Sequence, residues 1–539
     1  MKRIVLILAI ACLTANGMAQ DTIRFTWEGS TNEKTIHVGA TSGSNNIIIN
    51  WGDGTPSSTY NGTGFGIPIP HTYADTIRYN VLITTTDANT VLTYLYCSSN
   101  QLTALDVSGA TELWRLSCFS NQLTALDVSQ NTTLTELYCS SNQFSALDVS
   151  QNTALTELYC ESNQLSALDL SKNTALTKLS CEFNQLKTLD LSQNAALTEL
   201  RCRSNQLSAL DLSQNTALTG LFCSSNRLTA LDVSQNTALT ELYCEFNQLS
   251  TLDLSQNTAL TYLHCESNQL TVLDLNDCTE LTTLYCESNQ LTALDISQNT
   301  ALTMLNCQNN QLSVLDISQN TGLTTLNCQN NQLPLSQLYP IWKNKGITSA
   351  KTLMPQSIYD TVVVNRIIDL SNELAFGTPA VQTRFDITKK DGSPATDNYT
   401  FEDGELLFTA LGDYKVAMQN DSVRSGISEA GTALTVTAYY HVQTEETSIE
   451  EIETGNISIY PNPTTGQLTI ESPSLRGGTT KQSSEIIEKI EVCDISGRTV
   501  ETWHAASLQT IDISHLSNGI YLLKVKTTEG ETVRKIVKQ

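Results

Sequence analysis

Cysteine is the residue type in this chain whose chemistry and spacing stand out first. Twelve cysteines recur 21 residues apart without a slip: Cys97, Cys118, Cys139, Cys160, Cys181, Cys202, Cys223, Cys244, Cys265, Cys286, Cys307 and Cys328. Metal sites and disulfide frameworks use clustered, uneven spacings. A fixed spacing indicates a stacked repeat, in which each thiol packs as a small core hydrophobe. The Cβ atoms of neighbouring cysteines on in-register strands would lie about 4.8 Å apart, beyond the disulfide range of about 3.5–4.5 Å.

Aspartate forms a second regular column, which could bind cations. It comprises Asp106, Asp127, Asp148, Asp169, Asp190, Asp211, Asp232, Asp253, Asp274, Asp295 and Asp316. Carboxylates stacked about 5 Å apart repel each other by roughly 0.8 kcal/mol per neighbouring pair, even in water. Hydrogen bonds from nearby Ser or Thr are the favoured compensation, and bound cations are the alternative hypothesis.

Catalytic groups are sparse. An enzyme needs an acid, a base or a nucleophile that converge on one point. The chain has six histidines, of which only His264 lies within the repeats, and it has no metalloprotease, nucleophile-elbow, phosphate-loop or paired CxxC motif. We therefore expect a protein that is not an enzyme and that uses no cofactor and no metal. Glycoside hydrolysis by carboxylates of the repeat surface is the remaining enzymatic alternative.

The repeat itself explains these columns. One unit, Leu134 to Ala154, reads LTELYCSSNQFSALDVSQNTA. Each half has the alternating apolar pattern of a short strand and then turns at Ser and Asn. One coil cannot bury its leucines alone, so neighbouring coils must stack. A column of asparagines from Asn100 to Asn331 can satisfy the backbone groups at the turns, because an amide both donates and accepts. Cys278 replaces an asparagine of the second turn and is expected to be an isolated buried thiol.

This pattern resembles the leucine-rich repeat in the 21-residue cysteine-ladder form of some internalins, over residues 89–333. The prediction is a mainly β fold: a leucine-rich-repeat solenoid of about twelve 21-residue coils, flanked by small β-sandwich domains. The resemblance implies that the LxxLxC halves form a concave sheet, which is the usual ligand face of such solenoids.

The outward positions of the LxxLxC halves vary from coil to coil and carry an aromatic stripe flanked by carboxylates. Exposed tyrosine gives rigid, amphipathic contact area, which suits binding hot spots and stacking on sugar rings. The alternative is that exposed strand positions favour tyrosine and drift freely. The expected ligand-binding residues are Tyr138, Tyr159, Phe222, Tyr243, Tyr285, Glu157, Glu241 and Glu245.

The N-terminus reads as an export signal. Residues 1–19 combine a basic start, an apolar run from Ile4 to Leu13 and small residues before Gln20. The apolar run is too short to span a bilayer. A lipoprotein cleavage site before Cys12 is the alternative. Residues 20–88 contain the sequence WGDGT from Trp51 to Thr55 and resemble a PKD-type β-sandwich.

The regions after the repeats are expected to be β-rich. A short closing helix is predicted from Pro334 to Trp342, within a cap of the solenoid at residues 334–356. Residues 357–442 carry short β patterns broken by turns, as in a second, immunoglobulin-like β domain. Residues 443–456 are acidic and polar and read as a linker.

The last segment, residues 457–539, carries ISIYPNPTTGQLTI, VCDISGRTV and a basic tail. These motifs resemble the C-terminal sorting domain of type IX secretion substrates. The resemblance implies recognition by the type IX secretion machinery, passage across the outer membrane, and release or attachment to the cell surface.

The overall charge limits which classes of partner are expected. The chain has 30 basic and 55 acidic residues, a formal net charge of −25, which disfavours nucleic acid and anionic lipid as partners. No stretch is long and apolar enough for a transmembrane segment. We expect an exported cell-surface binding protein, an adhesin that engages a host or bacterial surface protein or glycan. The alternative is a structural or biofilm-matrix protein that acts by self-association.

Overall fold

The computed structural model describes residues 20–28, 33–41, 46–61, 67–87, 89–378, 380–424 and 433–444, and the strands between residues 458 and 538. The expected signal peptide and nearly all of the expected acidic linker lie outside the described residues. The chain divides into two compact units, Met1–Thr444 and Glu445–Gln539. Among the described residues, no helix has both the length and the apolarity that a membrane crossing requires.

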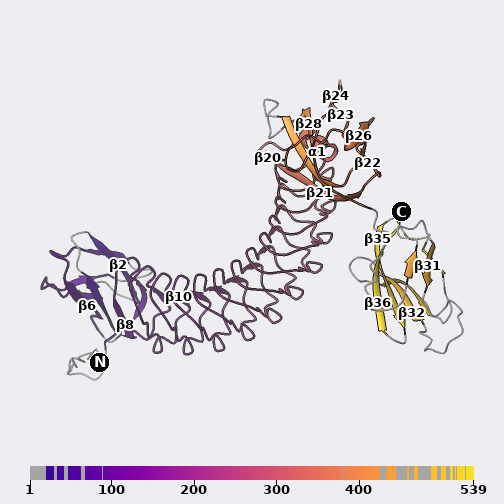
Figure 1. Cartoon of the computed structure of the whole chain (residues 1–539). Helices are drawn as coiled ribbons and strands as arrows, with labels where there is room; N and C mark the ends of the chain where they lie inside the picture. Colours follow the sequence, from indigo (N-terminus) through magenta and orange to yellow (C-terminus); the bar gives the residue numbers. More distant parts are fainter. Residues whose placement is uncertain are drawn as a thin grey trace, which may run out of the picture. The chain divides into compact units, whose positions relative to one another are not determined.

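The repeats form a solenoid of parallel three-residue strands, one in each coil, after a five-residue strand in the first coil. Each strand pairs in register with the strand 21 residues away in the next coil, and Figure 1 shows the coils stacked one upon the next. The predicted leucine-rich-repeat solenoid of twelve coils is confirmed. The strands are β7 (Leu92–Tyr96), β9 (Arg115–Ser117), β10 (Glu136–Tyr138), β11 (Glu157–Tyr159), β12 (Lys178–Ser180), β13 (Glu199–Arg201), β14 (Gly220–Phe222), β15 (Glu241–Tyr243), β16 (Tyr262–His264), β17 (Thr283–Tyr285), β18 (Met304–Asn306) and β19 (Thr325–Asn327).

The core of each coil is built from inward Leu and Cys side chains. In the β10 coil, Leu134, Leu137 and Cys139 are completely buried, whereas Glu136 and Tyr138 between them face outward. Each buried leucine stabilises the fold by roughly 1.5–3 kcal/mol. The twelve ladder cysteines are free, buried thiols, and burial raises the pKa of each of them, as for Cys118. The ladder is therefore part of the core, as predicted.

The asparagine column joins adjacent coils. The amide of Asn205 accepts a 3.0 Å hydrogen bond from the Leu186 N–H and donates to the carbonyls of Cys181 and Cys202, at 3.0 and 3.2 Å. The residue before it, Ser204, has a left-handed φ of 51°, which turns the chain out of the strand. The amide thus donates and accepts at the turn, as the sequence predicted.

The expected second strand, in the LDVS half, is wrong for most coils. Among the described coils, only the first forms it, as β8 (Ala104–Gly109), which pairs with β1 (Thr22–Glu28) of the N-terminal region. The Asp side chain accepts a hydrogen bond from the backbone N–H two residues further on, both in β8 (Asp106 Oδ1 from Ser108, 3.0 Å) and in later coils (Asp148 Oδ1 from Ser150, 2.9 Å). The first coil differs because β1 lies beside it as a partner strand. The bond from Ser150 holds the pKa of Asp148 below its usual range. Such local bonds stabilise the stacked carboxylates.

The second turn has its own asparagine column, in which Cys278 is an exception. Asn257 Nδ2 donates to the carbonyls of Val233 and Asn236 in the preceding coil, at 3.2 and 3.0 Å. The buried Cys278 thiol lies 3.9 and 3.8 Å from the equivalent carbonyls of Leu254 and Asn257. Sulfur is a weak donor, so this coil has weaker hydrogen bonds than its neighbours.

The N-terminal region caps the first coil. β2 pairs antiparallel with β7 and so extends the solenoid sheet, while β1 pairs with β8 on the other half of the coil. Trp27, Trp51 and Tyr73 are buried in the core of this region. The six strands of this region belong to the two sheets that continue into the first coil. They are β1 (Thr22–Glu28), β2 (Lys34–Ala40), β3 (Ile47–Asn50), β4 (Ser58–Tyr60), β5 (Ile67–His71) and β6 (Arg78–Thr85).

The last coil is closed by the predicted helix. Helix α1 (Leu335–Lys343) buries Leu335, Leu338 and Ile341 against the solenoid core. Strand β20 (Ala350–Thr352) then pairs with β19 and ends the solenoid sheet.

A β domain follows the closing helix. Its main sheet has the order β21-β29-β28-β25, and two smaller sheets accompany it. The elements are β21 (Gln356–Val363), β22 (Ile367–Asp369), η1 (Ser371–Glu373), β23 (Ala375–Phe376), β24 (Val381–Gln382), β25 (Arg384–Lys389), β26 (Tyr399–Glu402), β27 (Glu405–Phe408), β28 (Gly412–Arg424) and β29 (Ala433–Gln443).

The second compact unit contains two small antiparallel sheets, ordered β30-β31-β34 and β33-β32-β35-β36. Its described buried side chains include Ile490, Val492, Ile513 and Leu523. The strands are β30 (Ser458–Tyr460), β31 (Gln467–Glu471), β32 (Ile487–Cys493), β33 (Thr499–His504), β34 (Thr510–Asp512), β35 (Gly519–Thr527) and β36 (Gly530–Lys538).

Candidate binding site on the solenoid

The outward side chains of the solenoid strands and of the residue after each ladder cysteine form one surface, here named the strand face. It has three parallel columns: the outer column at the first strand residue, the ring column at the third, and the acid column after the cysteine. All eight residues expected from the sequence lie on the strand face. Tyr138, Tyr159, Phe222, Tyr243 and Tyr285 stand in the ring column, Glu157 and Glu241 in the outer column, and Glu245 in the acid column.

The structure divides the aromatic stripe into two groups. Because the strands are in register, Tyr138 stacks on Tyr159 with ring centroids 4.9 Å apart. Ser180 and Arg201 then interrupt the column. A second, continuous stack runs from Phe222 through Tyr243 and His264 to Tyr285, with successive centroids 4.8, 4.3 and 4.4 Å apart. His264 was not among the expected site residues, although its position in the ring column was visible in the sequence.

The Tyr138 group is satisfied internally. The Tyr138 hydroxyl donates to the carboxylates of Glu136 and Glu157, at 3.0 and 2.8 Å. Glu157 also pairs with Lys178 at 3.0 Å, and Arg115 pairs with Glu136 at 3.1 Å. Partial burial raises the pKa of Glu157, but the hydrogen bonds from Tyr138 and Lys178 outweigh it and lower that pKa overall. These carboxylates already have partners within the protein and are only 23 and 22% exposed, so they offer little to a ligand.

Two arginines stand where the second stack begins. The guanidinium carbon of Arg201 lies 4.3 Å from the centroid of the Phe222 ring. Arg203 lies 5.0 Å from the centroids of both Phe222 and Tyr243 and 3.7 Å from the Glu182 carboxylate. Arg203 stands in the acid column, so the equal distances place its cation beside the stack, between two rings. The protein itself thus seats a guanidinium between the ring column and a glutamate of the acid column.

The acid column beyond Arg203 lacks such cations. Glu245, Glu266 and Glu287 follow in successive coils, and each has one buried carboxylate oxygen with no hydrogen-bond partner. The structure describes one ion pair for this row, between Glu266 and His264 at 3.5 Å. Burial raises the pKa of Glu287 to about 7, and the neighbouring Glu266 carboxylate adds to the rise. The second stack is therefore flanked by acid groups that the fold leaves largely uncompensated.

Stacking decides which part of each ring a ligand meets. Both faces of Tyr243 are covered, one by Phe222 and the other by His264. A ligand on the strand face meets ring edges and hydroxyl groups instead. The suggestion that these tyrosines suit face-on stacking with sugar rings is therefore wrong for Tyr243, because neighbouring coils bring its ring neighbours within stacking distance.

Sequence reasoning missed two exposed phenylalanines at the border of the strand face. Phe183 and Phe246 are 55 and 57% exposed, and they follow the acid-column residues Glu182 and Glu245. Both occupy the left-handed turn position, with φ of 52° and 55°, where the other coils mostly have Ser. A left-handed conformation costs roughly 1–2 kcal/mol for a residue of this kind. Phenylalanine in a column of serine was the signal in the sequence.

Comparison with protein-family models identifies the end of the chain. Residues 458–539 match the secretion system C-terminal sorting domain. The chain carries a type IX sorting domain. The protein is therefore exported by the type IX system, to the outer-membrane surface or to the medium. None of the curated proteins matches the chain.

Several solved structures are similar to this chain. The functional domain of InlJ from Listeria monocytogenes, which includes a cysteine ladder, is 27% identical with a TM-score of 0.44, over 69% of this chain and 94% of the solved domain. The internalin InlF from Listeria monocytogenes is 24% identical with a TM-score of 0.46, over 47% of this chain and 78% of its own. A leucine-rich-repeat protein from Leptospira interrogans is 26% identical with a TM-score of 0.41, over 50% of this chain and 77% of its own.

Proposed function

We propose that this protein is an exported adhesin that binds a surface protein of a host or of another bacterium through one segment of the strand face. That segment, here named the ring segment, comprises the stack from Phe222 to Tyr285 and the carboxylates beside it. The observation that carries the proposal is the row Glu245, Glu266 and Glu287, which runs beside the ring stack without lysine or arginine partners among the described residues.

Charge distinguishes the ring segment from the coils before it. From Arg115 to Arg203, the three columns hold five carboxylates and four basic side chains, which nearly cancel. In the four coils of the ring segment, the same columns hold four carboxylates and no lysine or arginine. Complementary charge speeds association and fixes the register of an interface. The partner surface therefore carries lysine or arginine, and the position of Arg203, 5.0 Å from the Tyr243 ring, supports this choice because a guanidinium of the protein already lies beside the stack.

The remaining features support a protein partner over a glycan at this site. Ring edges, tyrosine hydroxyls and the exposed Phe246 give a broad contact, as at protein interfaces. The covered faces of Tyr243 exclude face-on stacking with a sugar. Tyr138, Tyr159 and Glu157, which were expected to bind, are instead neighbours that exclude water from the contact. Self-association through the ring segment is disfavoured, because two acidic surfaces repel.

The test is binding of the mature protein to a panel of immobilised surface proteins and glycans. The test variant is Glu245→Gln/Glu266→Gln/Glu287→Gln. The matched control is Asp232→Asn/Asp253→Asn/Asp295→Asn, which also replaces three acidic side chains in nearby coils, but away from the strand face. We expect a protein ligand whose affinity falls at least tenfold in the test variant and weakens with salt, but changes less than twofold in the control.

Other outcomes contradict the proposal. Equal affinity of the test variant and the wild type would exclude the ring segment as the site. A screen without any ligand, together with concentration-dependent self-association in sedimentation experiments, would favour the alternative function, a structural or biofilm-matrix protein that acts by self-association.

A further inference from the structure

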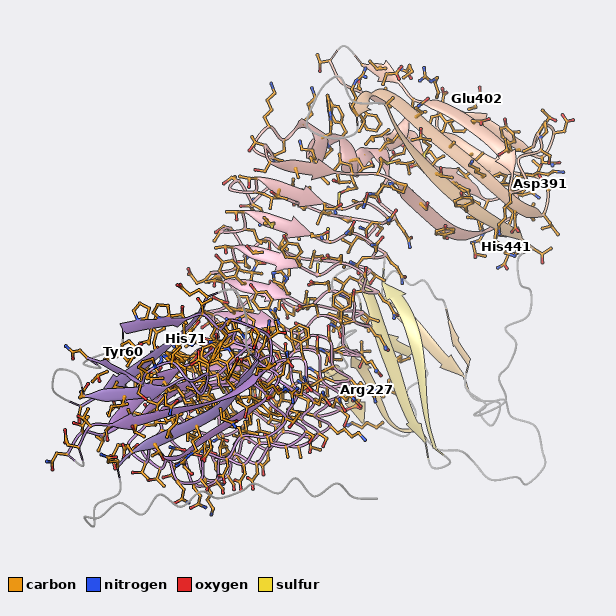
Figure 2. The ribbon with its side chains drawn as sticks, turned by 90° about the vertical axis from the view of Figure 1, so that its left-hand side faces the viewer. Tyr60, His71, Arg227, Asp391, Glu402 and His441 are labelled. Atoms are coloured by element: carbon orange, nitrogen blue, oxygen red, sulfur yellow. The ribbon has the colours of Figure 1, made fainter. Side chains whose placement is uncertain are left out.

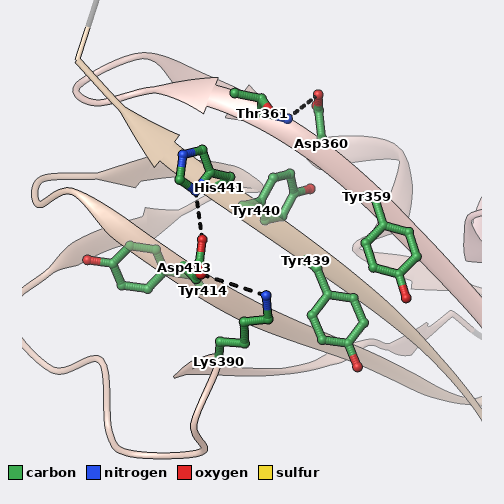
Figure 3. A pocket seen from close by; sticks show the side chains of 9 residues that line it. All are labelled: Tyr359, Asp360, Thr361, Lys390, Asp413, Tyr414, Tyr439, Tyr440 and His441. Atoms are coloured by element: carbon green, nitrogen blue, oxygen red, sulfur yellow. Dashed lines mark hydrogen bonds and ion pairs between the residues drawn. The ribbon is translucent and has the colours of Figure 1, made fainter.

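The β domain after the solenoid has a surface pocket of its own, of about 600 Å³ (Figure 3). Tyr359 of β21 and Tyr439 of β29 line one part of the pocket, and Lys390, Asp413 and His441 line another. Figure 2 shows His441 and Asp391, the neighbour of Lys390, toward the same end of this domain. Nothing in the role of the ring segment involves these residues.

The two tyrosines form a ring pair with one open face. Tyr359 and Tyr439 are directly opposite in the parallel pairing of β21 and β29, and their rings stack with centroids 5.1 Å apart and planes 11° apart. β21 is the edge strand of its sheet. Tyr439 therefore covers one face of the Tyr359 ring, and the side chain of Tyr359 remains 65% exposed. This is the reverse of Tyr243, whose two faces are both covered.

Hydrogen-bonding groups stand beside the ring pair. His441 Nδ1 and Asp413 Oδ1 are 2.7 Å apart, and Lys390 Nζ lies 3.7 Å from the other oxygen of Asp413. The side chains of Lys390, His441 and Asp413 are 67, 60 and 45% exposed. The bond from His441 is the main reason that the pKa of Asp413 lies below its usual range. The pocket thus offers a fixed carboxylate acceptor and two nitrogen groups, all accessible to a ligand.

This combination matches the two surfaces of a sugar. A pyranose ring has an apolar C–H face, which packs on an aromatic face, and a rim of hydroxyls, which needs donors and acceptors together. Pockets with aromatic walls and a few placed polar groups are typical small-ligand sites. We propose that Tyr359, Tyr439, Lys390, Asp413 and His441 form a saccharide-binding site. The protein then carries two binding sites of different chemistry, the ring segment for a basic protein surface and this pocket for a glycan.

The test uses the mature full-length protein on a glycan array, followed by calorimetric titration with the saccharides that bind. We expect Tyr359→Ala and Asp413→Asn each to weaken saccharide affinity at least tenfold. Tyr359→Phe keeps the aromatic face and should bind within about threefold of the wild type. These residues are exposed, and unchanged thermal unfolding would show that the variants fold. Tyr262→Ala is the matched control, an exposed tyrosine of the solenoid whose loss should leave saccharide binding unchanged.

Three results would overturn this proposal. One is no saccharide binding at millimolar concentration, and another is equal saccharide binding by Tyr359→Ala and the wild type. The third is loss of a protein ligand, but not of any saccharide, in Tyr359→Ala. The Glu245→Gln/Glu266→Gln/Glu287→Gln variant separates the two sites, because it should lose the protein ligand and keep the saccharide.

Discussion

The hydroxyl of Tyr138 donates a 2.8 Å hydrogen bond to the carboxylate of Glu157, which belongs to the next coil. The bond joins two columns of the strand face and is one reason that the pKa of Glu157 lies below its usual range. We expect Tyr138→Phe to raise the pKa of Glu157, because burial raises this pKa and one of the hydrogen bonds that lower it is then lost. An NMR titration of the Glu157 carboxyl measures the change.

The same variant should have little effect on adhesion, because the Tyr138 hydroxyl is already used within the protein. We expect the affinity for the protein ligand to change less than threefold. A loss of tenfold or more, as expected for the Glu245→Gln/Glu266→Gln/Glu287→Gln variant, would instead place Tyr138 in the interface.

Cys278 offers a stabilising substitution. Equivalent asparagines donate two hydrogen bonds to buried carbonyls of the preceding coil, as Asn257 does, whereas the Cys278 thiol lies 3.8 Å or more from its two carbonyls. We expect Cys278→Asn to raise the free energy of unfolding by about 1 kcal/mol at most, since two hydrogen bonds of about 1 kcal/mol each are partly offset by a buried amide oxygen without a partner, as at Asn257. Urea unfolding of the two proteins measures this. Cys278→Ser is the control, and a destabilised Cys278→Asn would show that the site cannot accommodate an amide.

Phe246 exposes apolar surface at the border of the strand face, in a backbone conformation that lowers the stability of the fold. Its φ is 55°, and later coils place Asn309 and Asn330 at the same turn position. Asparagine tolerates this conformation better than phenylalanine. We expect Phe246→Asn to stabilise the protein by roughly 1 kcal/mol and, in the same variant, to weaken binding of the protein ligand several-fold. Phe183→Asn is the comparison, because it should give the same stabilisation without the loss of affinity. Reduced stability with unchanged affinity would contradict both parts.

Glu287 makes the stability of the solenoid depend on pH. Burial raises its pKa from 4.5 to about 7, so the folded protein binds this proton more tightly than the unfolded chain. The resulting stabilisation is complete below pH 4.5 and is lost as the pH rises through about 7. We expect Glu287→Gln to be more stable than the wild type at pH 8, on the order of 1 kcal/mol after solvent screening, and nearly equal at pH 4. Thermal unfolding across this range is the measurement, with Glu241→Gln as the control, and the same difference at both pH values would refute the burial argument.

Much of the solenoid could be predicted from the sequence because a 21-residue period leaves little freedom. Each column faces its own copy in the next coil, so the repeat fixes the register of the strands, the cysteine ladder and the amide column that includes Asn205. The type IX sorting domain could also be recognised from its motifs. The second expected strand forms only in the first of the described coils, where β1 lies beside it as β8, and an alternating apolar pattern does not reveal whether a partner strand is present.

The sequence by itself determined the coil, its repetition and which side chains face outward. The tertiary structure decided what those side chains can do. Tyr243 and Tyr359 are the same residue type at outward strand positions, yet one has both ring faces covered and the other has one face open. The difference arises because Tyr243 lies between neighbouring strands of a long sheet, whereas Tyr359 lies on an edge strand. Strand order joins segments that are distant in the sequence, so only the folded chain shows which rings remain free for a ligand.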